Sequence, residues 1–546
     1  MLSLSRLTLL LCCAWAGTLL YGEMFTYWLP FWTCSWPHGE FSSSIMGIKQ
    51  NPDDRLNVAV LADPQLMDRT SLGLPPESMV LEAAKFYTDL YMRRSFLSSI
   101  LPFKPDIVLF LGDQFDGDRC CQTKSKESLF SCVIVFCIIY GRWKESLNRF
   151  KHIFYLKERG RDADIKLYYL SGNHDIGYSG LHSHHPEVIS RFEKDFGLRN
   201  YRFSVQKVDF IVIDAQTLDG PTKGNFTSLT WDFIKNISKD PSPNSRVLLT
   251  HIPLHRPDGT PCGPHRVSPI INQRVSHAGP DQGITYQNYL TEKTSEKLLE
   301  LIKPMLVLSG HDHDQCSVTH STSFGPVVEH TLGTVSWQQG NLYPSFMLLS
   351  VFAPAVINTT QGHQVSTSLC FLPRQTHIYI WYLCLFAVTI LMVSFWPSSG
   401  VGCWDRFVQV ISSFITTTKE KNEDEDCEYE MVWDAEGSMH LVKKATPKAL
   451  ASSSNDTGLM GRHHKPIFGN SSNAIARPAA KKYLRQEAEP SFAVDMSTDV
   501  KSAETCSGKS RAGRAAQRLV RILRLLLIIA TVNVPLYIML LFKDWI

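Results

Sequence analysis

Three long apolar segments without charged residues restrict the fold of this 546-residue chain more than any other feature. They are 7–21, which follows Arg6, then 378–396, and finally 525–542, which follows five arginines within 511–524. About 20 apolar residues in a helix span the hydrocarbon core of a bilayer. Lipid offers no hydrogen-bonding partner to the backbone, so such segments must be helical. The sequence therefore predicts a multi-pass membrane protein.

The positive charges beside these segments predict how the chain crosses the membrane. Arginine-rich flanks stay in the cytosol, which places 397–524 there and 40–377 on the lumenal side. The glycosylation acceptors Asn225, Asn236 and Asn358 fall on the lumenal side, in agreement.

The N-terminal segment 1–39 has two interpretations. An uncleaved signal anchor is favoured, because no small-x-small cleavage site precedes Glu23 and aromatic residues follow it. A cleaved signal peptide is the alternative.

The overall charge excludes two classes of protein. With 20% charged residues and a net charge of +3, the chain is neither a strongly basic nucleic-acid binder nor a highly charged disordered protein. Only 397–524 has the composition of a disordered linker, with an acidic stretch at 423–436 and no apolar periodicity over 450–515.

The lumenal region alternates short β-branched runs with helical stretches. The strand candidates are 58–63, 106–113, 166–175, 209–214, 246–251 and 305–313. Between the first two, 77–100 has apolar residues at helical spacing and is expected to be a crossover helix. Strands separated by helices predict an α/β fold with substantial parallel pairing.

Polar residues end five of these runs. Sites in α/β sheets form beyond the carboxyl ends of strands, so the five ends are expected to converge. Each motif alone has an ordinary explanation as a helix cap or a turn. Together, carboxylate and imidazole groups suit Mn²⁺, Zn²⁺ or iron, and there are enough for two ions. The residues are Asp63-Pro-Gln65, Gly112-Asp113-x-x-Asp116, Gly172-Asn173-His174-Asp175, His251 and Gly310-His311-x-His313.

The order of these motifs resembles that of the calcineurin-like metallophosphoesterases over residues 56–351. The resemblance implies a four-layer α/β/β/α sandwich with two divalent metal ions. It also implies that His174 protonates the leaving oxygen and that Asp116 orients its imidazole, while the two cations clamp a phosphoryl oxygen and activate a water. The implied metal ligands are Asp63, Gln65 and His313 for the first ion, Asn173, His251 and His311 for the second, and Asp113 for both.

Two features depart from the family pattern. Gln65 stands where the family usually has histidine, and an amide oxygen favours Mn²⁺ or Mg²⁺ over Zn²⁺, so Mn²⁺ is the expected metal. The segment 118–141 replaces a short loop with a cysteine-rich, partly apolar insertion. It is a lid, a membrane-surface element or, the favoured interpretation, a spurious insertion from a mis-assembled coding sequence.

Other residues near the motifs are candidates for substrate contact. His255, Arg256, Cys262 and His265 follow a ligand strand, where loops commonly bind substrates. For His330 and Trp337 the sequence leaves two options open, facing the site or packing beneath it. The pairing of the lumenal cysteines is also open.

The membrane context and the Asp-Pro-Gln motif resemble the branch of the family that remodels glycosylphosphatidylinositol (GPI) anchors. That resemblance implies a phosphodiesterase in the endoplasmic reticulum or Golgi membrane, which removes ethanolamine phosphate from the anchor glycan and aids export of GPI-anchored proteins. Its partners are those proteins and their cargo receptors. Two alternatives stay open: a phosphoesterase acting on another lumenal substrate, and a catalytically weak adaptor for cargo export.

Overall fold

The computed structural model divides the chain into two units, one made of Met1–Ser394 with Val520–Ile546 and the other of Phe395–Leu519. In the second unit it describes an antiparallel hairpin, β14 (Tyr429–Trp433) with β15 (Met439–Lys443), inside the predicted linker. The insertion 118–141 and most of that linker lie outside the described residues. The described residues are 4–37, 55–75, 78–116, 143–154, 165–182, 186–221, 225–242, 244–277, 283–352, 365–396, 429–433, 439–443 and 511–545.

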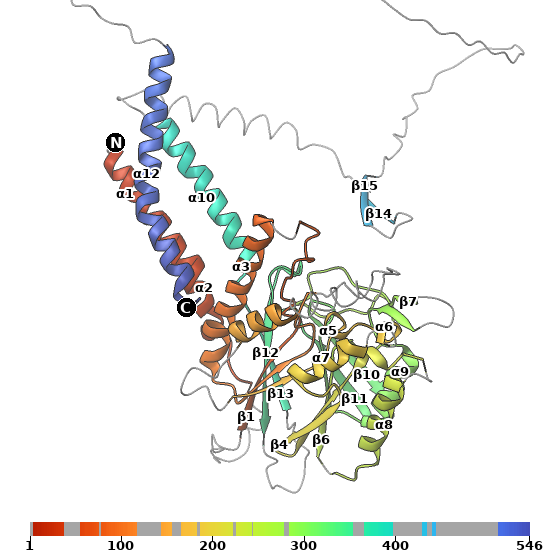
Figure 1. The fold of residues 1–546 in the computed structure, drawn as a ribbon. Coiled ribbons are helices and arrows are strands. Elements are labelled where there is room, and N and C mark those ends of the chain that lie inside the picture. The colour runs from red at the N-terminus through yellow and green to blue at the C-terminus, as the bar shows by residue number, and fades with distance from the viewer. Residues whose placement is uncertain are drawn as a thin grey trace, which may run out of the picture. The chain divides into compact units, whose positions relative to one another are not determined.

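Two mixed sheets form the centre of the first unit (Figure 1). Parallel pairs join β1, β2 and β3 in one sheet and β5, β6, β9 and β11 in the other, which confirms the predicted parallel pairing. The first sheet contains, in spatial order, β13 (Val365–Phe371), β12 (Ser345–Phe352), β1 (Arg55–Leu61), β2 (Ile107–Phe110) and β3 (Lys166–Tyr169). The second contains β10 (Cys316–Thr322), β11 (Gly325–Thr331), β9 (Leu306–Ser309), β6 (Ser245–Thr250), β5 (Val208–Ile213) and β4 (Tyr201–Val205).

Helices cover the outer faces of both sheets. Phe110 of β2 packs with Phe150 and Phe192 from helices on one side, and Leu248 of β6 packs with Leu298 on the other. A third apolar cluster fills the space between the sheets. This is the predicted four-layer α/β/β/α arrangement. The covering helices are α3 (Met79–Arg94), 143–154 and α7 (Pro186–Phe196) on the first sheet, and α8 (Asn225–Lys239) and α9 (Glu292–Ile302) on the second.

Short elements complete the domain. The crossover helix predicted at 77–100 is confirmed, with α3 continuing as a π-helical turn over Ser95–Ile100. The remaining elements are the 3₁₀ turns Leu101–Phe103 and Ala215–Thr217, the helices α5 (Asn173–Ile176) and α6 (Ser179–His182), and the strands β7 (Val275–His277) and β8 (Ile284–Gln287).

Three stretches are long and apolar enough to cross a membrane: Leu4–Thr33, Gln375–Phe395 and Ala515–Lys543. The first consists of α1 (Leu4–Leu20), a π-helical turn (Tyr21–Phe25) and α2 (Thr26–Thr33), and the others belong to α10 (Gln375–Phe395) and α12 (Arg511–Lys543). They match the three predicted segments. Residues 511–524, assigned to the linker from the sequence, are instead the first turns of α12.

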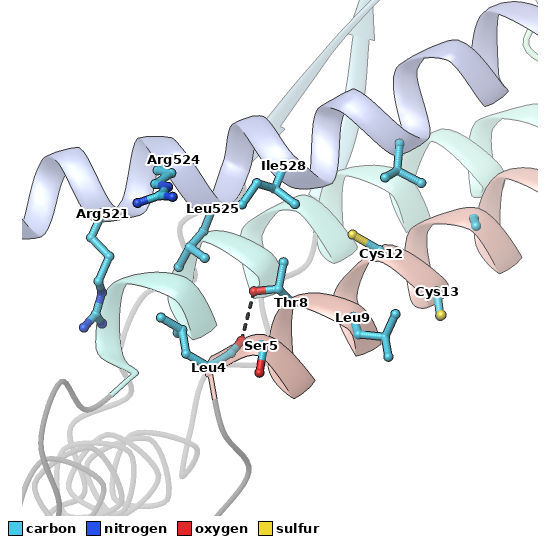
Figure 2. A pocket seen from close by; sticks show the side chains of 12 residues that line it. Leu4, Ser5, Thr8, Leu9, Cys12, Cys13, Arg521, Arg524, Leu525 and Ile528 are labelled. Atoms are coloured by element: carbon cyan, nitrogen blue, oxygen red, sulfur yellow. Dashed lines mark hydrogen bonds between the residues drawn. The ribbon is translucent and has the colours of Figure 1, made fainter.

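The arginine-bearing ends of α1 and α12 face each other across an apolar pocket (Figure 2). Its volume is about 850 Å³, and Leu4, Leu525 and Ile528 are among the side chains that line it, with Arg521 and Arg524 at one end. The N-terminal turns of α1, which carry Arg6, therefore lie beside Arg521 and Arg524 of α12, an arrangement consistent with the predicted topology.

A buried cluster of polar side chains joins these three candidate membrane-spanning helices (hereafter the membrane helices) to the α/β domain at their other end. The Arg94 guanidinium of α3 pairs with the Glu23 carboxylate, which also accepts a hydrogen bond of 2.9 Å from the Tyr382 hydroxyl. Arg94 Nε lies 3.4 Å from a carboxylate oxygen of Asp544, and its Nη2 donates to the carbonyl of Leu540 at 2.5 Å. One arginine thus contacts the first and third membrane helices directly and the second through Glu23.

Breaking this cluster is expected to destabilise the folded protein. Arg94→Met leaves the Glu23 carboxylate buried without its partner, so the free energy of unfolding should fall by about 3–5 kcal/mol. Combining Glu23→Gln with Arg94→Met removes both charges and should restore much of the loss. Unfolding of the detergent-solubilised variants measures both effects, and a double variant that is less stable than either single one would contradict the pairing.

Two disulfides pair the four predicted lumenal cysteines that lie among the described residues. Cys34, at the end of α2, bonds to Cys370 of β13, and Cys262 bonds to Cys316 of β10. The first disulfide fastens the N-terminal helix to the sheet. The second closes a loop beside the ends of the ligand-bearing strands.

Candidate metal centre

The strand-end motifs meet at one place, and Asp113 stands at its middle. Ligand atoms of Asp113, His251 and His311 lie within 4.8 Å of one another, and so do those of Asp63, Asp113 and His313. Asp113 belongs to both groups, as the family resemblance implied for a carboxylate that holds two ions. The three carboxylate and imidazole ligands on each side come from loops after β1, β2, β6 and β9.

The backbone of these loops is strained at the candidate ligands. Asp63, Gln65, Asp113, His311 and His313 have positive φ angles between 40° and 71°. They are five of the nine non-glycine residues with positive φ in the described part of the chain. Such conformations cost of order 1–3 kcal/mol each, and surrounding hydrogen bonds must hold them. Strain is therefore concentrated where side chains are aimed at one point.

Asp175 and Gly172 hold the two central loops together, a role that was not apparent from the sequence. The Asp175 carboxylate accepts hydrogen bonds from the backbone N–H groups of Gly172 (2.8 Å), Gln114 (3.0 Å) and Phe115 (3.3 Å). A Cβ atom on Gly172 would lie 2.0 Å from Asp113 Oδ1, so only glycine fits there. Burial and the charge of Asp113 raise the pKa of Asp175. In the sequence, Asp175 lies two positions after Asn173 within one short motif.

His251 is oriented as a metal ligand. Its Nδ1–H donates to the carbonyl of Leu111 at 2.8 Å, which directs Nε2 to within 3.0 Å of Asn173 Oδ1 and 3.3 Å of Asp113 Oδ1. Burial lowers the pKa of His251, but the charges of Asp113 and Asp63 outweigh it and raise that pKa to about 9. A proton and a divalent cation therefore compete for the same Nε2.

The other two histidines are held neutral, the form that binds metals. His311 Nε2–H donates to the carbonyl of Gln287 at 3.0 Å, which leaves Nδ1 as its free ligand atom. Burial and the charge of His251 lower the pKa of His311 to about 3. Burial is also the main cause that lowers the pKa of His313, to about 4.

Gln65 lies in the site despite its departure from the family pattern. Its Nε2 is 3.0 Å from Asp113 Oδ2 and 2.8 Å from His313 Nε2, and the side chain is buried. The main-chain carbonyl of Gln65 accepts a hydrogen bond of 2.7 Å from Gln338 Nε2. Turning the amide by 180° would exchange its nitrogen for its oxygen, an acceptor suited to a hard cation.

Gln65 is therefore expected to set the metal preference. Gln65→His supplies an imidazole nitrogen in place of an amide oxygen, and we expect the affinity for Zn²⁺ relative to Mn²⁺ to rise about tenfold or more. Competitive metal binding to the purified variant measures this ratio. Gln65→Ala is the control, because it removes the ligand without replacing it; equal ratios in all three proteins would place Gln65 outside the site.

His174 lies at the edge of the site, where the structure corrects one prediction. Its backbone N–H donates to Asp113 Oδ1 at 2.8 Å, and its Nε2 is 3.9 Å from Asp113 Oδ2. Nδ1 contacts the main-chain carbonyl of Asp116 at 2.5 Å, so Asp116 contacts the imidazole as predicted, but through its backbone and not through its carboxylate. The side chain is 36% exposed, so Nε2 can reach a substrate.

The residues after β6 are mostly structural. Arg256, predicted to contact substrate, is buried and pairs with Asp312 at 2.5 Å, which also binds Arg266 at 2.7 Å. Cys262 forms a disulfide with Cys316 rather than a substrate contact. Asp312 stands between the two ligands of the Gly-His-x-His motif, so both arginines fix that loop.

Three further candidates are placed by their contacts. His265 packs against the ring of Phe371, with 5.3 Å between ring centres. His330 Nδ1 is 2.8 Å from the Ser317 hydroxyl, and Trp337 packs edge-on against Tyr379 of α10. Trp337 thus meets a membrane helix. None of these three contacts involves a metal ligand.

The donor set fits a pair of divalent cations. Two carboxylates, three imidazoles and the amides of Asn173 and Gln65 converge, and this mixture of oxygen and nitrogen donors suits first-row divalent metals. Bound there, such ions supply Lewis-acid polarisation of a phosphoryl oxygen and a more acidic water.

Comparison with known proteins agrees with this geometry. Residues 56–315 match the family model described as calcineurin-like phosphoesterase. The chain is 29% identical over 358 residues to "Cell division control protein 1" of Saccharomyces cerevisiae, covering 63% of this chain and 66% of that protein. It is 26% identical to "Metallophosphoesterase 1" of Pongo abelii (67% of this chain, 83% of that one) and 25% identical to the Danio rerio protein of that name (71% and 92%). The α/β domain of this chain is therefore a calcineurin-like metallophosphoesterase, a hydrolase of phosphoric esters.

Proposed function

We propose that this protein is a manganese-dependent phosphodiesterase that removes ethanolamine phosphate from the glycan of GPI anchors. The observation that carries the proposal is that the candidate metal centre and three helices long and apolar enough to cross a membrane belong to one folded unit. An enzyme fixed to the bilayer in this way suits a substrate that is itself membrane-anchored. The likeness to proteins named Metallophosphoesterase 1 supports the reaction class.

The proposed site of action is the lumen of the endoplasmic reticulum or early Golgi. Arginines lie at one end of the helices, and the α/β domain joins the other end through the Arg94 cluster. Positive flanks favour the cytosol, so the domain is assigned to the lumen. Its two disulfides suit an oxidising compartment, and Asn236 is exposed on α8 as a glycosylation acceptor should be.

The chain's own residues provide acid catalysis in this proposal. Loss of a sugar alkoxide from phosphorus needs a proton, and His174 Nε2 is the exposed donor at the edge of the site. The carbonyl of Asp116 fixes the ring through Nδ1, and Asp113 accepts the backbone N–H of the same residue. The imidazole is thereby aimed without the need for a second carboxylate.

An assay of the full-length protein in detergent with Mn²⁺ tests the proposal. GPI glycans that carry ethanolamine phosphate should lose it, and free ethanolamine phosphate should appear. Simple phosphomonoesters serve as the comparison substrates. Hydrolysis confined to monoesters would contradict the proposed anchor remodelling. The protein would then be a phosphoesterase with another lumenal substrate.

A transport-rescue experiment distinguishes the proposed enzyme from the alternative, a catalytically weak adaptor. In cells lacking the protein, wild type should restore export of GPI-anchored cargo, including any step that needs cargo receptors. Asp113→Asn should fail to restore it at equal abundance. Equal rescue by this variant would mean that export requires the protein but not its metal centre.

A further inference from the structure

A second cavity lies where the membrane helices join the phosphoesterase domain. Its volume is about 830 Å³, within the usual range for sites that bind small ligands. Tyr21, Leu29 and Trp381 of the membrane helices line one side. The loop 264–267 and the segment 371–374, which leads from β13 into α10, line the other. All of these residues belong to the first unit.

The membrane side of this cavity is apolar and aromatic. Trp381 is 59% exposed, Tyr21 58% and Leu29 48%, so large side chains remain uncovered by protein. Tryptophan and tyrosine are enriched at the level of lipid head groups, where one end of the ring is wet and the other apolar. This side of the cavity therefore fits hydrocarbon next to a polar head group.

The domain side is cationic. Arg374 is exposed, and its guanidinium lies 5.0 Å from the ring centre of Tyr343, whose hydroxyl accepts a hydrogen bond of 3.4 Å from Nη1. No ion pair joins Arg374 to a carboxylate within the part of the chain that the structure describes. His265 and His377 also line the cavity, and no aspartate or glutamate among the described residues does. An exposed guanidinium in such surroundings complements a phosphodiester.

The walls of this cavity are bonded directly to the metal-binding loop. Arg266, which lines the cavity, pairs with Asp312 at 2.7 Å, and Asp312 stands between the ligands His311 and His313. The carbonyl of His313 accepts a hydrogen bond of 2.9 Å from Asn341 Nδ2, two residues before the cavity residue Tyr343. A molecule bound in the cavity would therefore contact segments that are themselves hydrogen-bonded to the metal-binding loop.

We propose that the cavity binds the phospholipid part of the membrane-anchored substrate, an inference that rests on the proposed function. The phosphodiester of the lipid pairs with Arg374, and its acyl chains lie against Leu29 and Trp381. The glycan attached to the same lipid is then tethered near the metal centre. Tethering raises the effective concentration of the scissile bond and lowers the KM without a new contact at the reacting phosphorus.

Reversing the charge of Arg374 tests the proposal in the full-length enzyme. Arg374→Glu should raise the KM for a GPI anchor that carries its acyl chains by about tenfold or more, because a carboxylate repels the phosphodiester. Its kcat/KM for the small soluble diester bis(p-nitrophenyl) phosphate should stay at the wild-type value. Lys293→Glu is the matched control, since it makes the same charge change at an exposed position of α9. An unchanged KM of Arg374→Glu for the lipid-bearing anchor overturns the proposal.

A lipid-binding measurement distinguishes failure of the proposed lipid site from failure of the proposed function. Native mass spectrometry of the same proteins with phosphatidylinositol should find one phospholipid retained by wild type and by Lys293→Glu, and its loss from Arg374→Glu. Retention by all three proteins, or by none, overturns the lipid site whatever the enzyme hydrolyses. If wild type binds the lipid but cleaves no GPI glycan, the proposed function fails and the substrate role of the cavity fails with it.

Discussion

Asp113→Asn should lower the rate of phosphodiester hydrolysis by about 10³-fold, or about 4 kcal/mol of transition-state stabilisation. Asp113 is the one carboxylate that belongs to both groups of candidate ligands. Asparagine keeps the size of the side chain and one acceptor oxygen for the His174 N–H, but it removes the charge that would hold two cations together. Hydrolysis of bis(p-nitrophenyl) phosphate at saturating Mn²⁺ measures the loss.

Thermal unfolding shows whether that loss reflects the metal or the fold. Burial and the charge of Asp113 raise the pKa values of Asp63 and Asp175, whereas burial of Asp113 is outweighed by the charge of His251, which lowers the pKa of Asp113. Asp113→Asn therefore relieves repulsion from two acids but loses an attraction to His251, so the metal-free variant should stay folded, with a melting temperature close to that of metal-free wild type. Added Mn²⁺ should raise the melting temperature of wild type and not of the variant. If the metal-free variant were already unfolded at the assay temperature, its inactivity would reflect loss of the fold and not loss of the metal.

His174→Ala should show a loss that depends on the leaving group. For a diester that releases a sugar hydroxyl, the departing oxygen needs a proton, and we expect a loss of about 10²–10⁴-fold. For a diester that releases p-nitrophenolate, a weak base, the loss should be below about tenfold. The comparison of kcat for the two substrates isolates proton donation from metal binding.

Asp116→Asn is the matched control for this experiment. The contact with His174 Nδ1 comes from the main-chain carbonyl of Asp116, so changing the side chain should leave both rates within a few-fold of wild type. A loss in Asp116→Asn as large as that in His174→Ala would restore the carboxylate role predicted from the sequence. Equal losses of His174→Ala on both substrates would assign His174 to binding instead of acid catalysis.

Much of the metal centre could be predicted because its ligands are local features of the sequence. Each candidate ligand directly follows an apolar strand, and parallel strands bring such ends to one edge. Asn173 and His251 illustrate this. They are 78 residues apart in the chain, yet Asn173 Oδ1 lies 3.0 Å from His251 Nε2. The membrane segments could be predicted equally well, because their length and lack of charge identify them without any tertiary information.

Features that depend on tertiary contacts could not be predicted in the same way. Arg94 lies in an ordinary amphipathic helix, and nothing near it in the sequence indicates Glu23 or Asp544 as partners. Asp312 occupied the unassigned position of Gly-His-x-His until its pairing with Arg266 gave it a role. The role of the Asp116 carbonyl was also hidden, because a sequence displays side chains and not the direction of the backbone.

The electron paramagnetic resonance spectrum of the Mn²⁺-loaded, full-length protein tests the central claim most directly, together with the metal content of the same sample. Two ions that share Asp113 should be magnetically coupled, so we expect two manganese ions per chain and a coupled spectrum that Asp113→Asn abolishes. At most one manganese per chain, with the six-line spectrum of an isolated ion, would contradict a two-metal phosphoesterase centre.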